Sequence, residues 1–208
     1  FNIGLLHTSA TYSGGEHDRY APCAVETLLA KGYDYWALGH IHKRQDLRRS
    51  SDQPHLAFPG NLQGRHIRET GPKGCSLVTV DEGHCADVRF CPVDVLRWEH
   101  CLVPVSGVAE PEEIVQRVAE RLSQLIDASD DRPLAVRVEL EGPCPAHRRL
   151  VSEPHRWMAE VQAAALQLGQ DRLWIERLVR RTSMPQSGAG QAALEGALGE
   201  LCECMQQM

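Results

Sequence analysis

Apolar runs and one helical pattern alternate in the first part of the chain. Residues 2–7, NIGLLH, form an apolar run that ends in a histidine, which is typical of a buried strand. After a loop rich in Gly, Ser and Thr, the pattern predicts a helix from Asp18, as its cap, to Lys31, with Gly32 ending it. The stretch DYWALGHIHKRQ, residues 34–45, begins as another apolar strand. This order of strand, helix and strand predicts a layered α/β arrangement.

The pattern becomes richer in strands after residue 43. The runs HLAFPG, CSLVTV and CADVRFCPVDV are punctuated by Gly, Pro and Asp. They predict antiparallel strands that close the sheet.

A second unit begins near Trp98. Its order is the strand HCLVPV, a helix from Pro111 to about Ala128, the strand LAVRVEL, a helix from about Glu153 to Leu168, and the strand LWIERLV. The first of these helices must pack one apolar stripe against a sheet. That stripe consists of Ile114, Val118, Leu122, Leu125 and Ile126. Apolar spacing also assigns Trp157 and Trp174 to the core of this small α+β domain.

The chain therefore divides into three predicted parts. Residues 1–97 form the first part, residues 98–182 the small α+β domain, and residues 183–208 a linker and terminal helix. The terminal helix carries Leu194, Leu198, Leu201 and Met205 on one face and contains two glycines. It is either a frayed chain end or a docking helix for a partner, and both interpretations stay open.

Composition narrows the class of protein. The 208 residues are 42% hydrophobic and 24% charged, as in an ordinary globular protein. No run has the length of a membrane span or the flanks of a signal peptide, which predicts a cytoplasmic protein with no membrane partner. Because the chain opens on Phe1 in a strand-like segment, we expect a fragment of a longer protein. The eight cysteines lack the spacing of a zinc site and are interpreted as buried free thiols.

Charge gives no general attraction for nucleic acid. The net charge is -6 and the pI is about 5.9, so binding to DNA would need a local basic patch. Lys43, Arg44, Arg48 and Arg49 form one basic cluster, which is more typical of a solvated loop.

Three histidines indicate metal chemistry. Neutral imidazole is a common ligand of divalent metals, and a glycine before His40 lets the chain turn at the strand end. His40 and His42 are separated by one residue and can serve two neighbouring ions. His7 ends the other apolar strand and adds a third ligand if the two strands are neighbours. The pattern favours a two-metal site of the kind that acts on phosphoryl groups.

Longer motifs carry a family resemblance. The segments LLHT, YDYWALGHIHKRQ and FPGNLQGRHIRETGPKGCSLVTVD resemble the last two ligand motifs and the following segment of the calcineurin-like metallophosphoesterases. They are most similar to the DNA repair exonuclease branch, the nuclease subunits of double-strand-break repair complexes and their bacterial relatives. The resemblance is strong from residue 1 to about 100, and the α+β unit beyond is similar in placement to the capping domain of that family.

The resemblance implies a fold and a role for each histidine. The fold would be the C-terminal half of a metallophosphoesterase β-sandwich flanked by helices, followed by the capping domain. His7 and His40 would bind the second metal and His42 the first. The ions would be two divalent metals, manganese first, with magnesium, iron or zinc as alternatives. The implied activity is metal-dependent hydrolysis of DNA phosphodiesters, as exonuclease or endonuclease, with an SMC-like ATPase partner and homodimerisation to be tested.

The departures from the family pattern matter as much. The earlier motifs DxH, GD and GNHD, which include the bridging aspartate and a catalytic histidine, are missing from the sequence, and Asp18 is no substitute. Two dications without a bridging carboxylate would repel each other. We therefore expect no catalytic residue within this chain and an inactive fragment, while a longer parent would be active.

Three residues near the metal motif are candidates for DNA contacts. Arg65, His66 and Arg68 are placed to meet a phosphate, with the alternative that the two arginines pair with Glu69 and hold a loop. The other histidines are interpreted as structural or surface residues. Two further functions stay open: a phosphoesterase acting on nucleotides or small phosphates, and a non-catalytic assembly module.

Overall fold

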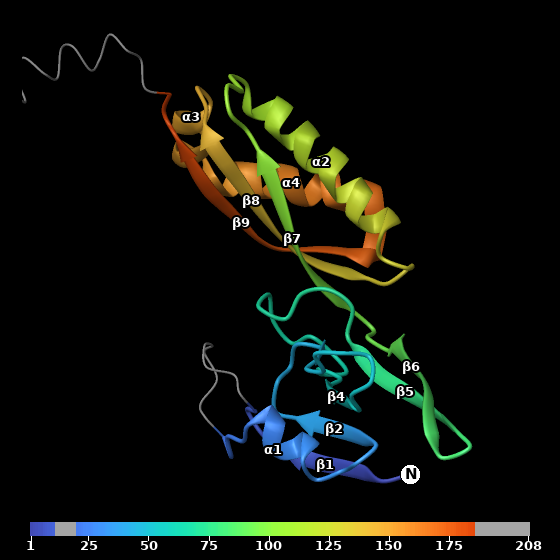
Figure 1. The fold of residues 1–208 in the computed structure, drawn as a ribbon. Helices are drawn as coiled ribbons and strands as arrows, with labels where there is room; N and C mark the ends of the chain where they lie inside the picture. Colours follow the sequence, from blue (N-terminus) through green and yellow to red (C-terminus); the bar gives the residue numbers. More distant parts are fainter. Residues whose placement is uncertain (11–19, 186–208) are drawn as a thin grey trace, which may run out of the picture. The chain divides into compact units, whose positions relative to one another are not determined.

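The computed structural model describes residues 1–10 and 20–185, apart from the side chain of Ala86 (Figure 1). The chain divides into two compact units. Unit 1 consists of Phe1–Glu99 and Arg132–Ala135, and unit 2 of His100–Asp131 and the chain from Val136 onward. The mixture of helices with several β-sheets confirms the predicted α+β, layered α/β class. The predicted domain limits at residues 97 and 182 stay a prediction.

Unit 1 contains a sheet with the strand order β1-β2-β4-β3. Strands β1 (Ile3–His7), β2 (Tyr35–Gly39) and β4 (His55–Phe58) run parallel, and the short β3 (Gln45–Asp46) is antiparallel to β4. The antiparallel pairing expected of the HLAFPG run is confirmed towards β3 and is wrong towards β2, which β4 joins in parallel. The two apolar runs that lead to the histidines are neighbours, as the metal hypothesis requires.

The first helix is shorter than its pattern predicts. Helix α1 covers Val25–Leu29, and its N-cap Ala24 makes no side-chain capping bond. Pro22 explains the late start, because a proline disfavours helical backbone in the residue before it, and Ala21 has a φ of 39°. The proposed cap, Asp18, lies outside the described residues. Gly32, with a φ of 69°, follows shortly after the helix as predicted.

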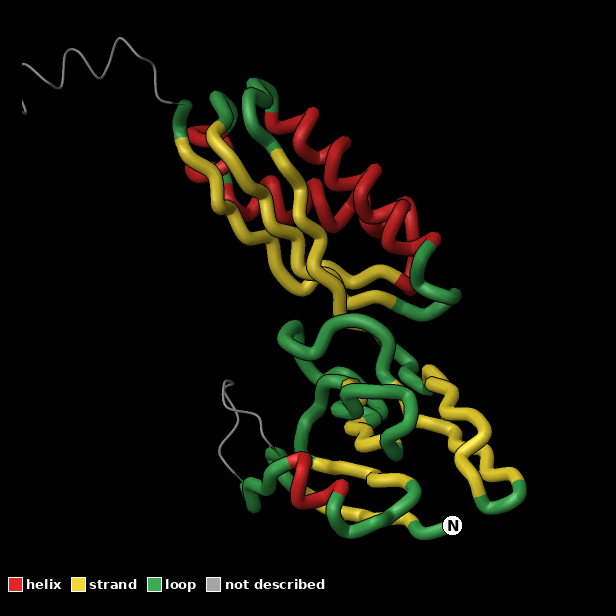
Figure 2. The backbone as a smooth tube through the Cα atoms, in the orientation of Figure 1, coloured by secondary structure: helices red, strands yellow, loops and turns green. Residues whose placement is uncertain are grey.

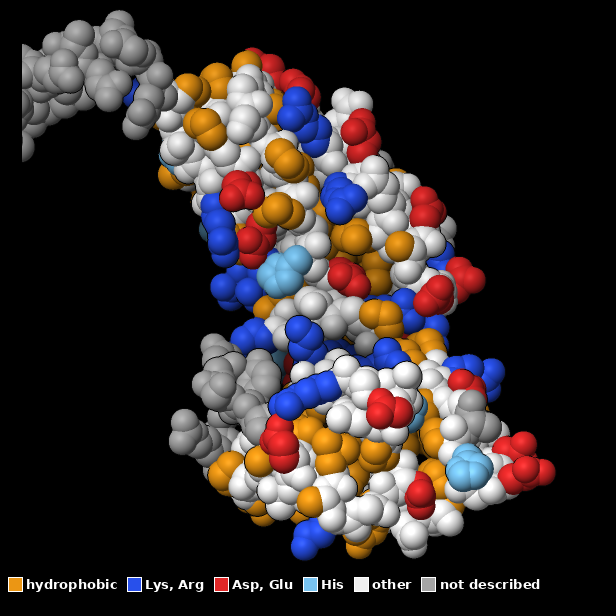
Figure 3. Space-filling view, viewed as in Figure 1, with side chains coloured by type: hydrophobic (Ala, Val, Ile, Leu, Met, Phe, Trp, Pro, Cys, Tyr) orange, Lys and Arg blue, Asp and Glu red, His pale blue; other side chains and the backbone are white. Residues whose placement is uncertain are grey.

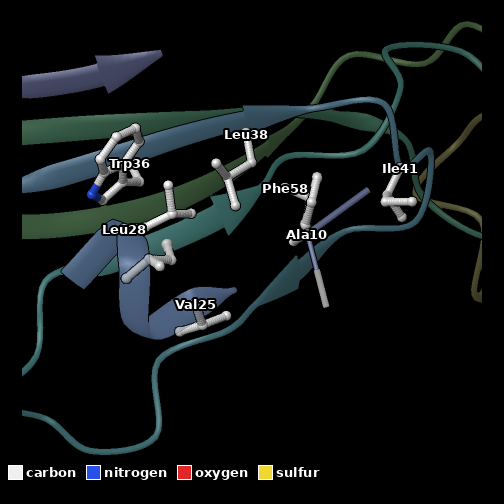
Figure 4. Close-up of a cluster of buried hydrophobic side chains, with 8 residues drawn as sticks. Ala10, Val25, Leu28, Trp36, Leu38, Ile41 and Phe58 are labelled. Carbon is white, nitrogen blue, oxygen red and sulfur yellow. The ribbon is translucent and has the colours of Figure 1, made fainter. Parts of the chain in front are cut away.

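Helix α1 and the sheet enclose the core of unit 1 (Figure 4). The buried cluster is formed by Ala10, Val25, Leu28, Trp36, Leu38, Ile41, Leu56 and Phe58. Gly4 lies opposite Trp36 in the β1–β2 register, and a Cβ at position 4 would come within 2.3 Å of the indole ring. A side chain there would overpack the core, so glycine is required at this position of β1.

A hairpin forms the second sheet of unit 1. Strands β5 (Gly74–Asp81) and β6 (His84–Pro92) pair antiparallel, as their sequences predict, with an irregularity between Thr79 and Val80. The turn residues Glu82 and Gly83 both have positive φ, at 46° and 78°, which is the backbone of a tight hairpin turn. The long segment between β4 and β5 is irregular loop (Figure 2).

Unit 2 is a three-stranded sheet with helices on one face (Figures 1 and 2). The strand order is β7-β8-β9. The elements are β7 (Arg97–Pro104), α2 (Pro111–Asp127), β8 (Leu134–Pro143), α3 (His147–Ser152), α4 (Pro154–Gly169), the 3-10 turn η1 (Gln170–Arg172) and β9 (Leu173–Ser183).

The predicted helices of unit 2 are confirmed. Ile114, Val118 and Leu122 of α2 are buried, and α4 packs against both α2 and β9. Trp157 is a core residue with 1% of its surface exposed. The same assignment for Trp174 is wrong, because this side chain is 68% exposed on β9.

The burial expected of the cysteines is confirmed only in part. Among the described cysteines, Cys101 and Cys144 are buried free thiols, whereas Cys75 is exposed and Cys23, Cys85 and Cys91 are intermediate. Burial is therefore right for two of them and wrong for Cys75.

Over the described part of the chain, every helix falls short of the length and apolar character that crossing a membrane requires. Most of the predicted linker and the terminal helix lie outside the described residues.

Candidate functional site

His7 and His40 meet at one edge of the unit 1 sheet. His7 is the last residue of β1 and is paired in register with Gly39, the last residue of β2. Since β1 and β2 are parallel, their carboxyl ends bring His7 and the following His40 together. The centroids of the two imidazole rings are 5.2 Å apart, with an angle of 74° between the rings. Two of the three predicted metal ligands therefore lie side by side.

Gly39 serves a different purpose from the one its sequence position suggests. The sharp turn is made by His40 itself, whose φ of 102° lies in the region that side chains rarely adopt. A Cβ at position 39 would instead come within 3.0 Å of Nδ1 of His7. The glycine gives the imidazole of His7 room against β2. Backbone strain of the kind stored at His40 is common at functional sites.

Tyr20 is a third ring at this edge that the sequence pattern did not indicate. Its ring centroid lies 5.2 Å from that of His7 and 5.8 Å from that of His40, nearly parallel to the latter. Ser9 holds the segment in place, because its backbone N–H donates to the carbonyl of Tyr20 over 2.8 Å. Thr8 donates its hydroxyl to the carbonyl of Ala21 over 2.7 Å. Tyr20 is 55% exposed and offers an aromatic face beside the two imidazoles.

His42 contacts a buried carboxylate, Glu69. Nδ1 of His42 lies 2.6 Å from Oε1 of Glu69, which has 8% of its side chain exposed. The other oxygen, Oε2, accepts from Nδ2 of Asn61 over 3.0 Å and from the backbone N–H of Arg65 over 2.9 Å. Burial alone would raise the pKa of Glu69, but the hydrogen bonds from His42 and Arg65 and the nearby histidines lower it to about 2. Glu69 is therefore ionised.

The loop around Glu69 is tied down at several points. Gln63 donates to the carbonyl of Leu96 over 2.7 Å and accepts from the N–H of Val95 over 2.9 Å. Gly64 lies so close to the chain that a Cβ would approach the carbonyl oxygen of Glu69 to 2.6 Å. These contacts explain why the GNLQG run contains small and amide residues.

Arg65, His66 and Arg68, the candidate DNA contacts, are exposed on this same loop. Glu69 contacts Arg65 through the backbone amide, so the carboxylate holds the loop by its main chain. Nε2 of His66 lies 3.8 Å from Oε1 of Glu69, beyond hydrogen-bonding distance. The role of Arg65, His66 and Arg68 in contacting DNA stays a prediction.

The basic cluster after the metal motif is engaged locally. Arg48 pairs with Asp46 over 3.0 Å and Arg49 with Glu26 over 2.8 Å. The guanidinium of Arg44 lies over the ring of Phe90, 4.7 Å from its centroid. These contacts favour the solvated-loop interpretation.

The donor chemistry fits a divalent metal, although these residues do not complete a site. Imidazole nitrogens are suitable ligands, and a carboxylate on the far nitrogen of a metal-binding histidine is a common arrangement. Among residues 1–10 and 20–185, no group of three or more His, Cys, Asp or Glu side chains is arranged to hold a metal ion. The assignments of His7, His40 and His42 as ligands therefore stay predictions.

Comparison with known proteins gives two matches. Residues 98–183, from β7 to β9, match the family model described as metallophosphoesterase YhaO, middle domain. The chain is also 43% identical over 146 residues to the uncharacterized metallophosphoesterase YhaO of Bacillus subtilis (strain 168). Both matches support a metallophosphoesterase family. Metallophosphoesterases are hydrolases that use divalent metals. For this chain, hydrolysis, the metals and the exonuclease branch stay proposals.

The extent of the second match bears on function. It covers 70% of this chain and 34% of the relative, so the chain spans about a third of the length of the curated relative. Activity, substrate and partners of a whole metallophosphoesterase are therefore matters of proposal for this chain.

Proposed function

We propose that a longer protein containing this chain hydrolyses phosphodiester bonds of DNA with divalent metals. The observation that carries the proposal is the meeting of the His7 and His40 rings, 5.2 Å apart, at the carboxyl ends of two parallel strands. Ligands delivered from strand ends have a rigid backbone behind them, which a metal centre requires. His7, His40 and His42 would supply imidazole ligands, and the remaining ligands would come from residues beyond this chain.

The bound metals would polarise a phosphodiester and activate water for attack. Two divalent ions are proposed, with manganese the first to test and magnesium, iron and zinc as alternatives. The chain's own residues orient the ligands. Gly39 leaves room for the ring of His7, His40 bends the chain at the strand end, and Glu69 holds His42.

DNA is proposed as the substrate because exposed cationic residues lie near the candidate ligands. Arg65, His66 and Arg68 project from the loop whose Glu69 contacts His42. Guanidinium groups pair well with phosphate. Several Lys and Arg side chains also lie on the face of unit 1 drawn in Figure 3, although the chain carries a net charge of -6. An SMC-like ATPase partner and a homodimer belong to the same proposal and are testable by co-purification and light scattering.

The test uses the full-length protein with manganese. We expect cleavage of linear duplex DNA that is abolished by His40→Gln and strongly reduced by His7→Gln. His84→Gln changes an exposed residue of the β5–β6 hairpin and is the matched control, which should leave cleavage unchanged. Hydrolysis of a small chromogenic diester without DNA cleavage would favour a phosphoesterase acting on small substrates. Absence of both activities would contradict the proposal and favour an assembly module.

A further inference from the structure

Three donors converge on the carboxylate of Glu69, and they are divided between its two oxygens. Oε1 faces Nδ1 of His42 at 2.6 Å. Oε2 accepts from Nδ2 of Asn61 at 3.0 Å and from the backbone N–H of Arg65 at 2.9 Å. The side chain is 8% exposed, so these contacts satisfy a carboxylate that water reaches poorly.

This division determines which nitrogen of His42 carries the proton. An ionised carboxylate can only accept hydrogen bonds, so neutral His42 must donate from Nδ1. The lone pair of the ring then lies on Nε2, the nitrogen able to bind a cation. The hydrogen bond also fixes the ring about its χ angles, since the short distance of 2.6 Å permits little rotation.

We propose that Glu69 is a positioning residue that holds His42 in the Nδ1–H tautomer and presents Nε2 to a divalent cation. This inference rests on the proposed function, in which His42 is a metal ligand. Glu69 itself touches no reacting atom and acts through His42.

The surroundings of Glu69 are built to keep it in place. Asn61 is fixed by a second hydrogen bond, from Nδ2 to the carbonyl of Gln63 over 2.9 Å. The backbone of His42 is also held, because the N–H of Asn61 donates to its carbonyl over 3.3 Å. A Cβ at Gly60 would come within 2.8 Å of that same carbonyl oxygen, so the loop and the metal motif lie in close contact.

The isosteric substitution Glu69→Gln provides a sharp test. If the new amide keeps its oxygen on His42, its NH₂ group points at two other donors, Nδ2 of Asn61 and the backbone N–H of Arg65. A backbone N–H cannot become an acceptor, so that hydrogen bond is lost. If the amide turns over, its oxygen keeps both of those bonds and its NH₂ group faces Nδ1 of His42. The second orientation preserves more hydrogen bonds. It requires His42 to accept at Nδ1 and to carry its proton on Nε2, where the lone pair is then lost.

The first experiment measures the tautomer of His42 in the metal-free 208-residue chain by long-range ¹⁵N–¹H NMR of the imidazole rings above pH 7.5. His42→Gln identifies the signals of this ring by their loss. We expect Nδ1–H in the wild-type chain and Nε2–H in E69Q, with Glu160→Gln, an exposed residue of α4, as the unchanged control. Nε2–H in the wild-type chain would overturn the inference, even if E69Q fails to fold. An unchanged tautomer in folded E69Q would overturn it as well.

The second experiment titrates Zn²⁺ into the same variants by calorimetry. We expect the affinity of E69Q to fall by about 10-fold, the lower end of the effect of such supporting carboxylates. The two proposals fail separately. If His7→Gln, His40→Gln and His42→Gln leave Zn²⁺ binding unchanged, the metal site fails while the tautomer result stands. If those variants weaken binding but E69Q does not, the role of Glu69 fails.

Discussion

The imidazole of His7 packs against the backbone of Gly39, with 3.0 Å between its Nδ1 and the position that a Cβ at residue 39 would occupy. The two residues are partners in the β1–β2 register. The glycine before the histidine motif thus makes space for a histidine on the neighbouring strand. Gly39 therefore lies against one candidate ligand, His7, and directly precedes the other, His40, in the sequence.

Gly39→Ala should therefore disturb His7. The imidazole must move by a few tenths of an ångström to admit the new methyl group. We expect the ring resonances of His7 to shift in NMR spectra, while those of His147 in unit 2 stay in place. Gly32→Ala is the control, because position 32 has open space but a φ of 69°. That variant should lose about 1 kcal/mol of stability without shifting His7. Identical His7 signals in wild type and Gly39→Ala would show that the contact is not tight.

At position 40, a glycine variant should be more stable than an alanine variant, which reverses their usual order of stability. Its φ of 102° suits glycine and strains any other residue. We expect His40→Gly to be about 1 kcal/mol more stable than His40→Ala in thermal unfolding. Gln124 in α2 is the matched control, since there the alanine variant should be the more stable by about 1 kcal/mol. If both positions favour alanine, the backbone at His40 is unstrained.

The elements with long local patterns could be predicted from the sequence. Helix α2 combines Pro111 in its first turn with a stripe of Ile114, Val118 and Leu122, and both signals are contained within the helix itself. The apolar runs of β1 and β2 are equally local. Their parallel pairing brought His7 to His40, as the metal hypothesis required.

The partners of these histidines could not be predicted in the same way. Glu69 lies 27 residues beyond His42, and no local periodicity connects them. Tyr20 belongs to a segment that the pattern assigned to a helix, and it reaches the site through backbone bonds to Ser9. The shortness of α1 was foreseeable, because Pro22 opposes helix in the residue before it.

A substitution in the buried ion cluster of unit 1 should cause a larger loss of stability than the glycine and histidine substitutions above. Asp94 and Arg97 are each 3% exposed, and Oδ2 of Asp94 accepts from Nε of Arg97 over 2.9 Å. Arg132 lies at 2.9 Å from the other oxygen. Asp94→Asn would remove the buried negative charge that Arg97 and Arg132 contact, so we expect a loss of about 3–5 kcal/mol.

Urea unfolding followed by circular dichroism measures this loss. Asp87→Asn is the control, because Asp87 is exposed on β6 and its replacement should change stability by less than about 0.5 kcal/mol. Equal midpoints for the two variants would mean that the cluster contributes nothing.

Cys101 should make the stability of unit 2 depend on alkaline pH. Burial raises the pKa of its thiol to about 11, against 9.0 for an ordinary cysteine, and nearby Arg121 offsets this only in part. Because the folded-state pKa is the higher one, the stabilisation is complete below pH 9 and is lost as the pH rises towards 11. The loss should reach about 3 kcal/mol.

We expect urea unfolding at pH 8 and pH 10.5 to show a smaller pH effect in Cys101→Ala than in the wild-type chain. The alanine removes the titrating thiol, while the cost of the cavity is the same at both pH values and cancels in the comparison. Cys75→Ala changes an exposed thiol and should retain the full wild-type pH effect. If Cys101→Ala also retains it, then other groups, tyrosines and lysines among them, cause the alkaline loss, and the thiol of Cys101 titrates alike in the folded and unfolded chain.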